Sequence, residues 1–107
     1  MINMIKIPKQ IKIAGFIYKV KLVDYLYDES NNLLSGRIKY GEHLIEIATD
    51  SCDKQEQIQS LFHEIIHGII KHYYIEFGEN SDEELICNKF SDAIMAMLLD
   101  NDFKVDD

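Results

Sequence analysis

Residues 58 to 70 read Ile-Gln-Ser-Leu-Phe-His-Glu-Ile-Ile-His-Gly-Ile-Ile, and this stretch decides the fold. Its apolar residues recur at intervals of three and four, which is the spacing of one face of an α-helix. The pattern extends on both sides and includes Ile58, Leu61, Phe62, Ile65, Ile66, Ile69, Ile70 and Tyr73. The sequence therefore predicts an amphipathic helix over about residues 53 to 74.

Two histidines, His63 and His67, flank this apolar stripe. An α-helix has about 3.6 residues per turn, so a spacing of four places both imidazoles on nearly the same face. Imidazole is a common zinc ligand, and Glu64, roughly 100° around the helix, can take a proton from a metal-bound water. The pattern His-Glu-x-x-His thus predicts a zinc-dependent hydrolase with Glu64 as general base. Gly68 either leaves space beside that carboxylate or lets the helix pack closely on a neighbour.

The composition limits the partners and the number of domains. With 107 residues and 47% hydrophobic content, we expect one domain over residues 1 to 107. The formal charge of -8 disfavours nucleic acid or an anionic membrane as partner. Five lysines lie within residues 1 to 27, and we interpret them as the outer face of the first strands.

The sequence also indicates a compartment. It has no segment of membrane-spanning length and no signal-peptide pattern, so we expect a cytoplasmic protein. Cys52 and Cys87 lack the paired spacing of a thiolate zinc site and fit a reducing compartment. Cys87 falls within a helical pattern, where we expect a small buried apolar residue.

The remaining pattern predicts an α+β fold, with a small antiparallel sheet of about three strands followed by two packed helices. Apolar and polar residues alternate over residues 11 to 27, a turn-rich stretch covers 28 to 35, and a hairpin begins at Gly36 with its second strand at 44 to 48. Asp50, Ser51 and Asp53 are candidate caps of the first helix. A second helix is predicted over about residues 82 to 99, and the last residues are expected to fray.

Catalytic zinc usually has three protein ligands and one water, so a third ligand is needed. His72 lies five residues beyond His67, roughly 140° around the helix, and cannot share the ion. Tyr73 stands where the longer metzincin motif has its third histidine, which disfavours that class. Glu83 and Glu84 remain, because an antiparallel second helix brings its first turn near the motif.

The two glutamates also have an alternative interpretation as helix caps. Ser81 and Glu84 have the spacing of a capping box, as do Asn80 and Glu83. Acidic residues favour a helix N-terminus in any case. Spacing therefore leaves both the metal role and the choice between Glu83 and Glu84 open.

A family resemblance addresses this choice. Leu61-Phe62-His63-Glu64-Ile65-Ile66-His67-Gly68, followed by Glu84-Leu85-Ile86-Cys87-Asn88-Lys89-Phe90-Ser91, resembles ImmA/IrrE-type metallopeptidases, especially the short versions in phages and other bacterial mobile elements. The second segment is similar to the family's Glu-x-x-Ala-Asn-x-Phe-Ala, and the resemblance implies that Glu84 is the third ligand. Cys87 and Ser91 replace the usual alanines, and the family's Leu-Met-Pro ending and C-terminal extension are missing. This implies a minimal zincin-like core whose substrate-selecting parts are reduced or supplied by a partner.

The expected function is hydrolysis of a peptide bond, with Zn²⁺ held by His63, His67 and Glu84 and with Glu64 as general base. The resemblance implies a protein or peptide substrate, such as a repressor-like regulator encoded nearby. The predicted strand over residues 44 to 48 is a candidate edge strand that an extended substrate would join. The oligomeric state stays open.

The residue that stabilises the oxyanion is not assigned. Tyr73, Tyr74, His72 and His43 are candidates by residue type, but such residues near a helix end more often serve packing or the surface. The alternative function is a non-catalytic regulatory or interaction module with a structural or vestigial zinc site, which the small size favours. A DNA-binding module is disfavoured, because the predicted helices are acidic.

Overall fold

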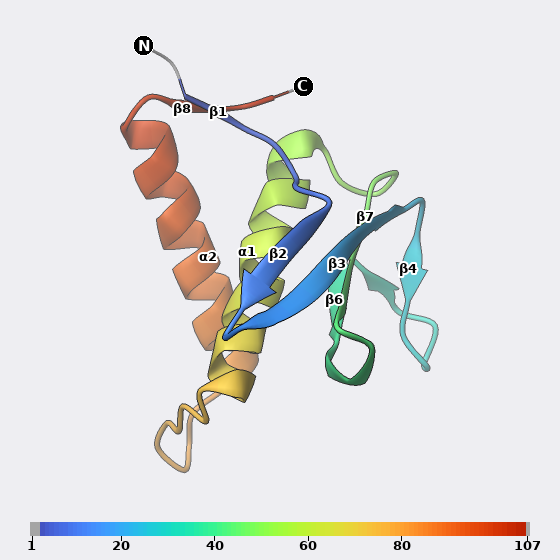
Figure 1. The fold of residues 1–107 in the computed structure, drawn as a ribbon, viewed down its shortest axis with the longest axis vertical. Coiled ribbons are helices and arrows are strands. Elements are labelled where there is room, and N and C mark those ends of the chain that lie inside the picture. Colours follow the sequence, from blue (N-terminus) through green and yellow to red (C-terminus); the bar gives the residue numbers. More distant parts are fainter. Residues whose placement is uncertain (1–2, 107) are drawn as a thin grey trace.

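The structure is a computed structural model that describes residues 3 to 106, and it confirms the α+β class (Figure 1). Short strands come first, two helices follow, and a final strand ends the described chain. In order, the elements are β1 (Asn3–Ile5), β2 (Gln10–Ile13), β3 (Phe16–Val23), β4 (Leu26–Tyr27), β5 (Leu33–Leu34), β6 (Gly36–Lys39), the 3₁₀ turn η1 (Tyr40–Glu42), β7 (Leu44–Ala48), α1 (Lys54–His72), α2 (Glu83–Asp100) and β8 (Phe103–Val105).

The main sheet has four strands in the order β2-β3-β7-β6 and is mixed, whereas about three antiparallel strands were expected. Strands β2 and β3 pair antiparallel, as do β6 and β7, but β3 and β7 are parallel. The parallel pairing follows from the segment that connects β3 to β7. There the chain makes the separate β4–β5 ribbon and then β6, so it re-enters the sheet beside β3 in the same direction.

The strand over residues 44 to 48 is therefore central, and its predicted role as an edge strand is wrong. Ile45 and Ile47 are fully buried toward α1, and Glu46 on the opposite face is only 7% exposed beneath Arg37 and Lys39. Burial on both faces is typical of an interior strand. The free edges of the sheet belong to β2 and β6.

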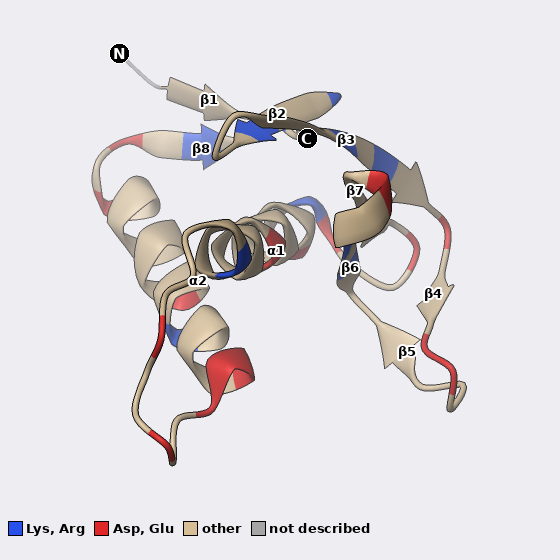
Figure 2. Cartoon of the chain, turned by 60° about the horizontal axis from the view of Figure 1, so that its bottom comes forward, with Lys and Arg blue, Asp and Glu red and all other residues tan. Residues whose placement is uncertain are grey.

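The core lies between the inner face of the sheet and α1. Its buried members are Ile13, Tyr18, Ile45, Ile47 and Leu61. Helix α1 was predicted over residues 53 to 74 and begins after Asp53, whose side chain accepts the backbone N–H of Glu56 in a capping box. Helix α1 packs on the sheet with one side and on α2 with the other (Figures 1 and 2).

The end of the described chain departs from expectation. Residues 103 to 105 do not fray but form β8, which pairs in parallel with β1. Charge is unevenly placed, with Lys and Arg along β2, β3 and β8 and acidic residues around the start of α2 (Figure 2). Lys12, Lys19 and Lys21 are exposed on the sheet face away from α1, as interpreted from the sequence, whereas Lys6 and Lys9 lie in the connection between β1 and β2. Among the described residues, no helix is long and apolar enough to cross a membrane.

Candidate metal centre

Helix α1 supplies the first two members of the site. His63 and His67 lie one turn apart on the side of α1 that meets α2, with side chains 13% and 14% exposed. Their ring centroids are 4.8 Å apart. Glu64 between them is 7% exposed and belongs to the buried side of the helix. The arrangement expected from the spacing of the motif is thus present.

Helix α2 supplies the acidic members from its first turn. Its N-cap is Asp82, whose carboxylate accepts the backbone N–H of Leu85 at 3.2 Å. With the cap at this position, neither Glu83 nor Glu84 stands three residues after it, so the capping boxes suggested by the sequence do not form. Both glutamates are free to turn toward α1.

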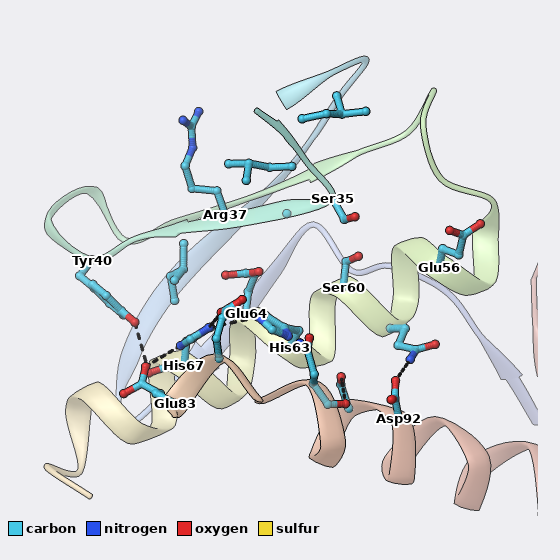
Figure 3. Close-up of a pocket in the computed structure, with 18 residues that line it drawn as sticks. Ser35, Arg37, Tyr40, Glu56, Ser60, His63, Glu64, His67, Glu83 and Asp92 are labelled. Carbon is cyan, nitrogen blue, oxygen red and sulfur yellow. Dashed lines mark hydrogen bonds and ion pairs between the residues drawn. The ribbon is translucent and has the colours of Figure 1, made fainter. Parts of the chain in front are cut away.

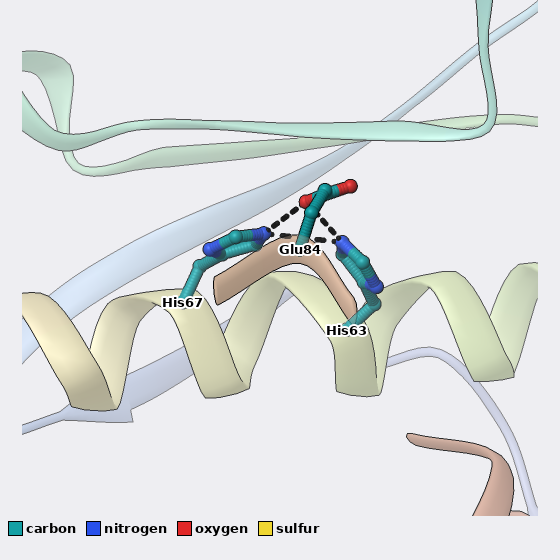
Figure 4. A group of neighbouring side chains, drawn as sticks. All are labelled: His63, His67 and Glu84. Atoms are coloured by element: carbon teal, nitrogen blue, oxygen red, sulfur yellow. Dashed lines mark hydrogen bonds and ion pairs between the residues drawn. The ribbon is translucent and has the colours of Figure 1, made fainter. Parts of the chain in front are cut away.

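Three potential ligand atoms meet at one point (Figure 4). Glu84 Oε1 lies 2.9 Å from His63 Nε2 and 2.5 Å from His67 Nε2, and the two Nε2 atoms are 3.1 Å apart. Ligand atoms about 2.0–2.2 Å from a tetrahedral zinc lie roughly 3.3 Å from one another, so this triangle is slightly tighter than a zinc site.

The donor chemistry also fits a cation. His67 Nδ1 lies 2.6 Å from Glu83 Oε2, which makes Nδ1 the protonated nitrogen and leaves the Nε2 lone pair facing Glu84. Carboxylates that hold the second nitrogen of a ligating histidine are common around metals. Lone pairs that converge in this way need a metal ion or protons between them. The group can therefore hold a metal ion through His63, His67 and Glu84.

Protons hold the same cluster together without a metal. Burial alone lowers the pKa of His67, but the hydrogen bonds to Glu83 and Glu84 outweigh it and raise the pKa above its ordinary value. For Glu84, burial raises the pKa, and the two imidazoles more than reverse this, so its pKa is lowered. Metal and protons compete for these atoms.

A second group of potential ligands consists of His67, Glu83 and Cys87. Cys87 is fully buried, as predicted, and burial together with the nearby carboxylates raises its pKa to about 12. A thiol binds metal as the thiolate, so this group is the weaker metal site. Glu84, not Glu83, contacts both imidazole Nε2 atoms.

Glu64 does not join the ligand triangle. Burial raises the pKa of its carboxyl group, and the imidazoles of His63 and His67 offset only part of this effect. Gly68 does not provide the space beside the Glu64 carboxylate. A Cβ on Gly68 would lie 3.0 Å from Ile13 Cδ1, so that glycine serves close packing. The glycine that adjoins Glu64 is Gly36 on β6, which was expected from the sequence only to open the hairpin.

An open cavity of about 750 Å³ adjoins the cluster (Figure 3). Its walls are β5, β6 and Tyr40 on one side and α1 and the start of α2 on the other. His63, Glu64, His67, Glu83 and Glu84 all line it. The cavity also reaches Ser35, Ser60 and Asp92 on the side away from Tyr40 (Figure 3). The candidate ligands and Glu64 thus face space that a polypeptide segment could enter.

The candidate oxyanion donors are elsewhere. Tyr73 and Tyr74 are 62% and 87% exposed, and neither lines the cavity. His43 and His72 pack against the ring of Phe16, with ring centroids 5.0 and 4.7 Å away. None of the four therefore stands beside the cluster.

Tyr40 is the residue that sequence reasoning missed. Its hydroxyl reaches the cavity and donates a weak hydrogen bond, 3.4 Å long, to the carbonyl oxygen of His67. Burial and the charges of Glu83 and Glu64 raise its pKa to about 12, so the hydroxyl keeps its proton. The only available signal was its position at the hairpin tip beyond β6.

Comparisons of this chain with protein-family models, with curated proteins and with solved structures found no match.

Proposed function

We propose that this protein is a zinc-dependent metallopeptidase. The observation that carries the proposal is the meeting of His63 Nε2, His67 Nε2 and Glu84 Oε1 beside the buried Glu64 in an open cavity. Three ligands with room for a water are typical of catalytic zinc, whereas structural zinc usually has four protein ligands. When bound, zinc would supply a Lewis acid and a water of lowered pKa.

The residues of the chain divide the remaining work. Glu64 accepts a proton from the attacking water and returns it to the nitrogen of the broken peptide bond. The burial of Glu64 supports this role, because burial raises the pKa of its carboxyl group toward neutral pH. A group whose pKa lies near the working pH can both accept a proton and return it. Glu83 orients His67, and the Tyr40 hydroxyl is available to the carbonyl oxygen of the substrate.

An extended polypeptide is the substrate class that suits the cavity. Strand β6 pairs with β7 on one side only, and residues 36 to 38 line the cavity. An edge strand offers unpaired backbone groups to which a peptide can add as a further strand. This supports a protein or peptide substrate, and the resemblance to ImmA/IrrE-type metallopeptidases extends the proposal to a repressor-like regulator.

The test is proteolysis of a mixture of unstructured proteins by the zinc-loaded chain, read by mass spectrometry of the fragments. The wild-type chain is expected to cut internal peptide bonds. Glu64→Gln should abolish cutting and retain zinc, because Glu64 is not a ligand. Glu79→Gln, in the exposed loop before α2, is the matched control. Cutting by Glu64→Gln at the wild-type rate would refute the assigned base.

One observation favours the second candidate, a non-catalytic interaction module. Helix α2 leaves large apolar side chains exposed, among them Leu85 at 50%, Phe90 at 57% and Met97 at 53%. Exposed apolar groups on one helix are typical of contact surfaces. A chain that binds zinc and gains stability from it, yet cuts no protein in the mixture, would favour this module over the peptidase.

A further inference from the structure

Helix α1 and strand β6 meet at two successive levels. Four residues of a helix rise about 6.0 Å and two residues of a strand about 6.7 Å, so the two elements stay in phase over this distance. At one level Glu64 faces Gly36, and at the next Gly68 faces Ile38. Each level pairs one glycine with one larger side chain.

The level at Gly36 adjoins the proposed base. Gly36 pairs with the inward-facing Ile47 and so presents its α-carbon to α1. A Cβ added to Gly36 would lie 3.3 Å from Glu64 Oε2, 3.2 Å from Ile47 Cδ1 and 3.4 Å from the carbonyl oxygen of Glu46. The first two distances are tighter than ordinary van der Waals contact. The backbone at Gly36 has no left-handed φ that would itself require glycine.

The Glu64 carboxylate is buried except where it meets the cavity. It is 7% exposed, and within residues 3 to 106 no side chain or backbone group donates a hydrogen bond to it. A buried carboxylate without a protein donor needs water. Gly36 and Glu64 both line the cavity from which water arrives. A methyl group at position 36 would occupy space directly beside Oε2.

We infer that Gly36 is a positioning residue for Glu64: without a side chain, it keeps beside Oε2 the room that the attacking water needs. This inference rests on the proposed peptidase function. In that reaction the water oxygen bonds to the carbonyl carbon, one water proton passes to Glu64 and then to the amide nitrogen, and the C–N bond breaks. Glycine in a strand often marks a site where a ligand or another backbone approaches closely.

The experiment compares Gly36→Ala with Gly41→Ala on a fluorogenic peptide that carries a sequence the wild-type chain cuts in the protein mixture. Gly41 is the matched control, because a Cβ there meets nothing within 4 Å. Gly36→Ala is expected to lower kcat at least tenfold, with KM and bound zinc within twofold of the wild-type values. Gly41→Ala should leave kcat, zinc and Tm unchanged.

Two further variants distinguish crowding of the Glu64 carboxylate from a general packing effect of the added methyl group. In a Glu64→Asp chain the carboxylate lies one methylene further from position 36, so adding Gly36→Ala to that chain should lower its kcat less than twofold. If Gly36→Ala lowers Tm, adding Ile47→Val removes the other close contact and should restore Tm but not kcat. Recovery of kcat with Ile47→Val would show a packing effect and overturn the inference, as would wild-type kcat in Gly36→Ala. An inactive wild-type chain would instead refute the proposed function, and this inference with it.

Discussion

Glu84→Gln is expected to weaken zinc binding far more than Glu83→Gln, although the two residues are neighbours in one helical turn. Glu84 Oε1 contacts both imidazole Nε2 atoms, at 2.9 and 2.5 Å. Four-ligand zinc sites contribute about 10–16 kcal/mol, or roughly 2.5–4 kcal/mol per ligand, so losing one ligand should raise Kd about 10²–10³-fold. Glu83 touches only the outer nitrogen of His67, where such partners contribute about 10–100-fold.

The assay is zinc titration by calorimetry, with Tm measured in parallel. Zinc at about 1,000 times the wild-type Kd stabilises the folded chain by about 4.1 kcal/mol. A Kd raised about 300-fold leaves roughly 0.9 kcal/mol of this stabilisation, and the loss of about 3 kcal/mol should lower Tm by on the order of 10 °C. Glu79→Gln is the charge-matched control. A larger loss in Glu83→Gln than in Glu84→Gln, or a wild-type Tm indifferent to zinc, would refute the assigned ligand set.

Three further predictions concern the cavity and its supports. Tyr40→Phe should retain zinc and Tm but lower kcat about 10²-fold if its hydroxyl meets the oxyanion, and an unchanged kcat in peptide assays would exclude that role. Gly68→Ala should lower the unfolding free energy by up to about 2 kcal/mol in urea titrations, because a Cβ 3.0 Å from Ile13 Cδ1 costs about 1–3 kcal/mol and alanine regains about 1 in helix propensity. Burial raises the pKa of the Glu46 carboxyl group, but Arg37 and Lys39 together outweigh this effect and hold the pKa below its ordinary value of 4.5. The stability that Glu46 contributes should therefore be complete above pH 4.5 and be lost as the pH falls through the folded pKa, and thermal melts of Arg37→Met should show a smaller pH dependence than wild type.

The sequence predicted α1 and its motif because both depend on local spacing. The apolar period and the Asp53 cap lie within one continuous segment, and two histidines four residues apart must share a face. The second helix and the hairpin of β6 and β7 followed from similarly local patterns. These parts of the fold required no knowledge of the rest of the chain.

The parts that could not be predicted depend on contacts distant in sequence. The parallel pairing of β7 with β3 and of β8 with β1 leaves no local pattern, and it decided which strand is the edge. The choice of Glu84 over Glu83 depends on how α2 crosses α1, because both lie in the same turn. Tyr40 and Gly36 acquire their roles only when β6 is placed beside the helix.

Helix α2 packs on α1 but buries only Cys87, Ser91 and Met95, and this has a consequence for chelation. An ion held by His67 and Glu84 would join the two helices across their exposed connection, and because it binds only the folded chain it would stabilise that arrangement by mass action. Because α2 also forms one wall of the cavity, removing that ion would loosen the proposed binding site for a polypeptide together with the proposed metal centre. Metal-depleted protein should then lose substrate capture and turnover together.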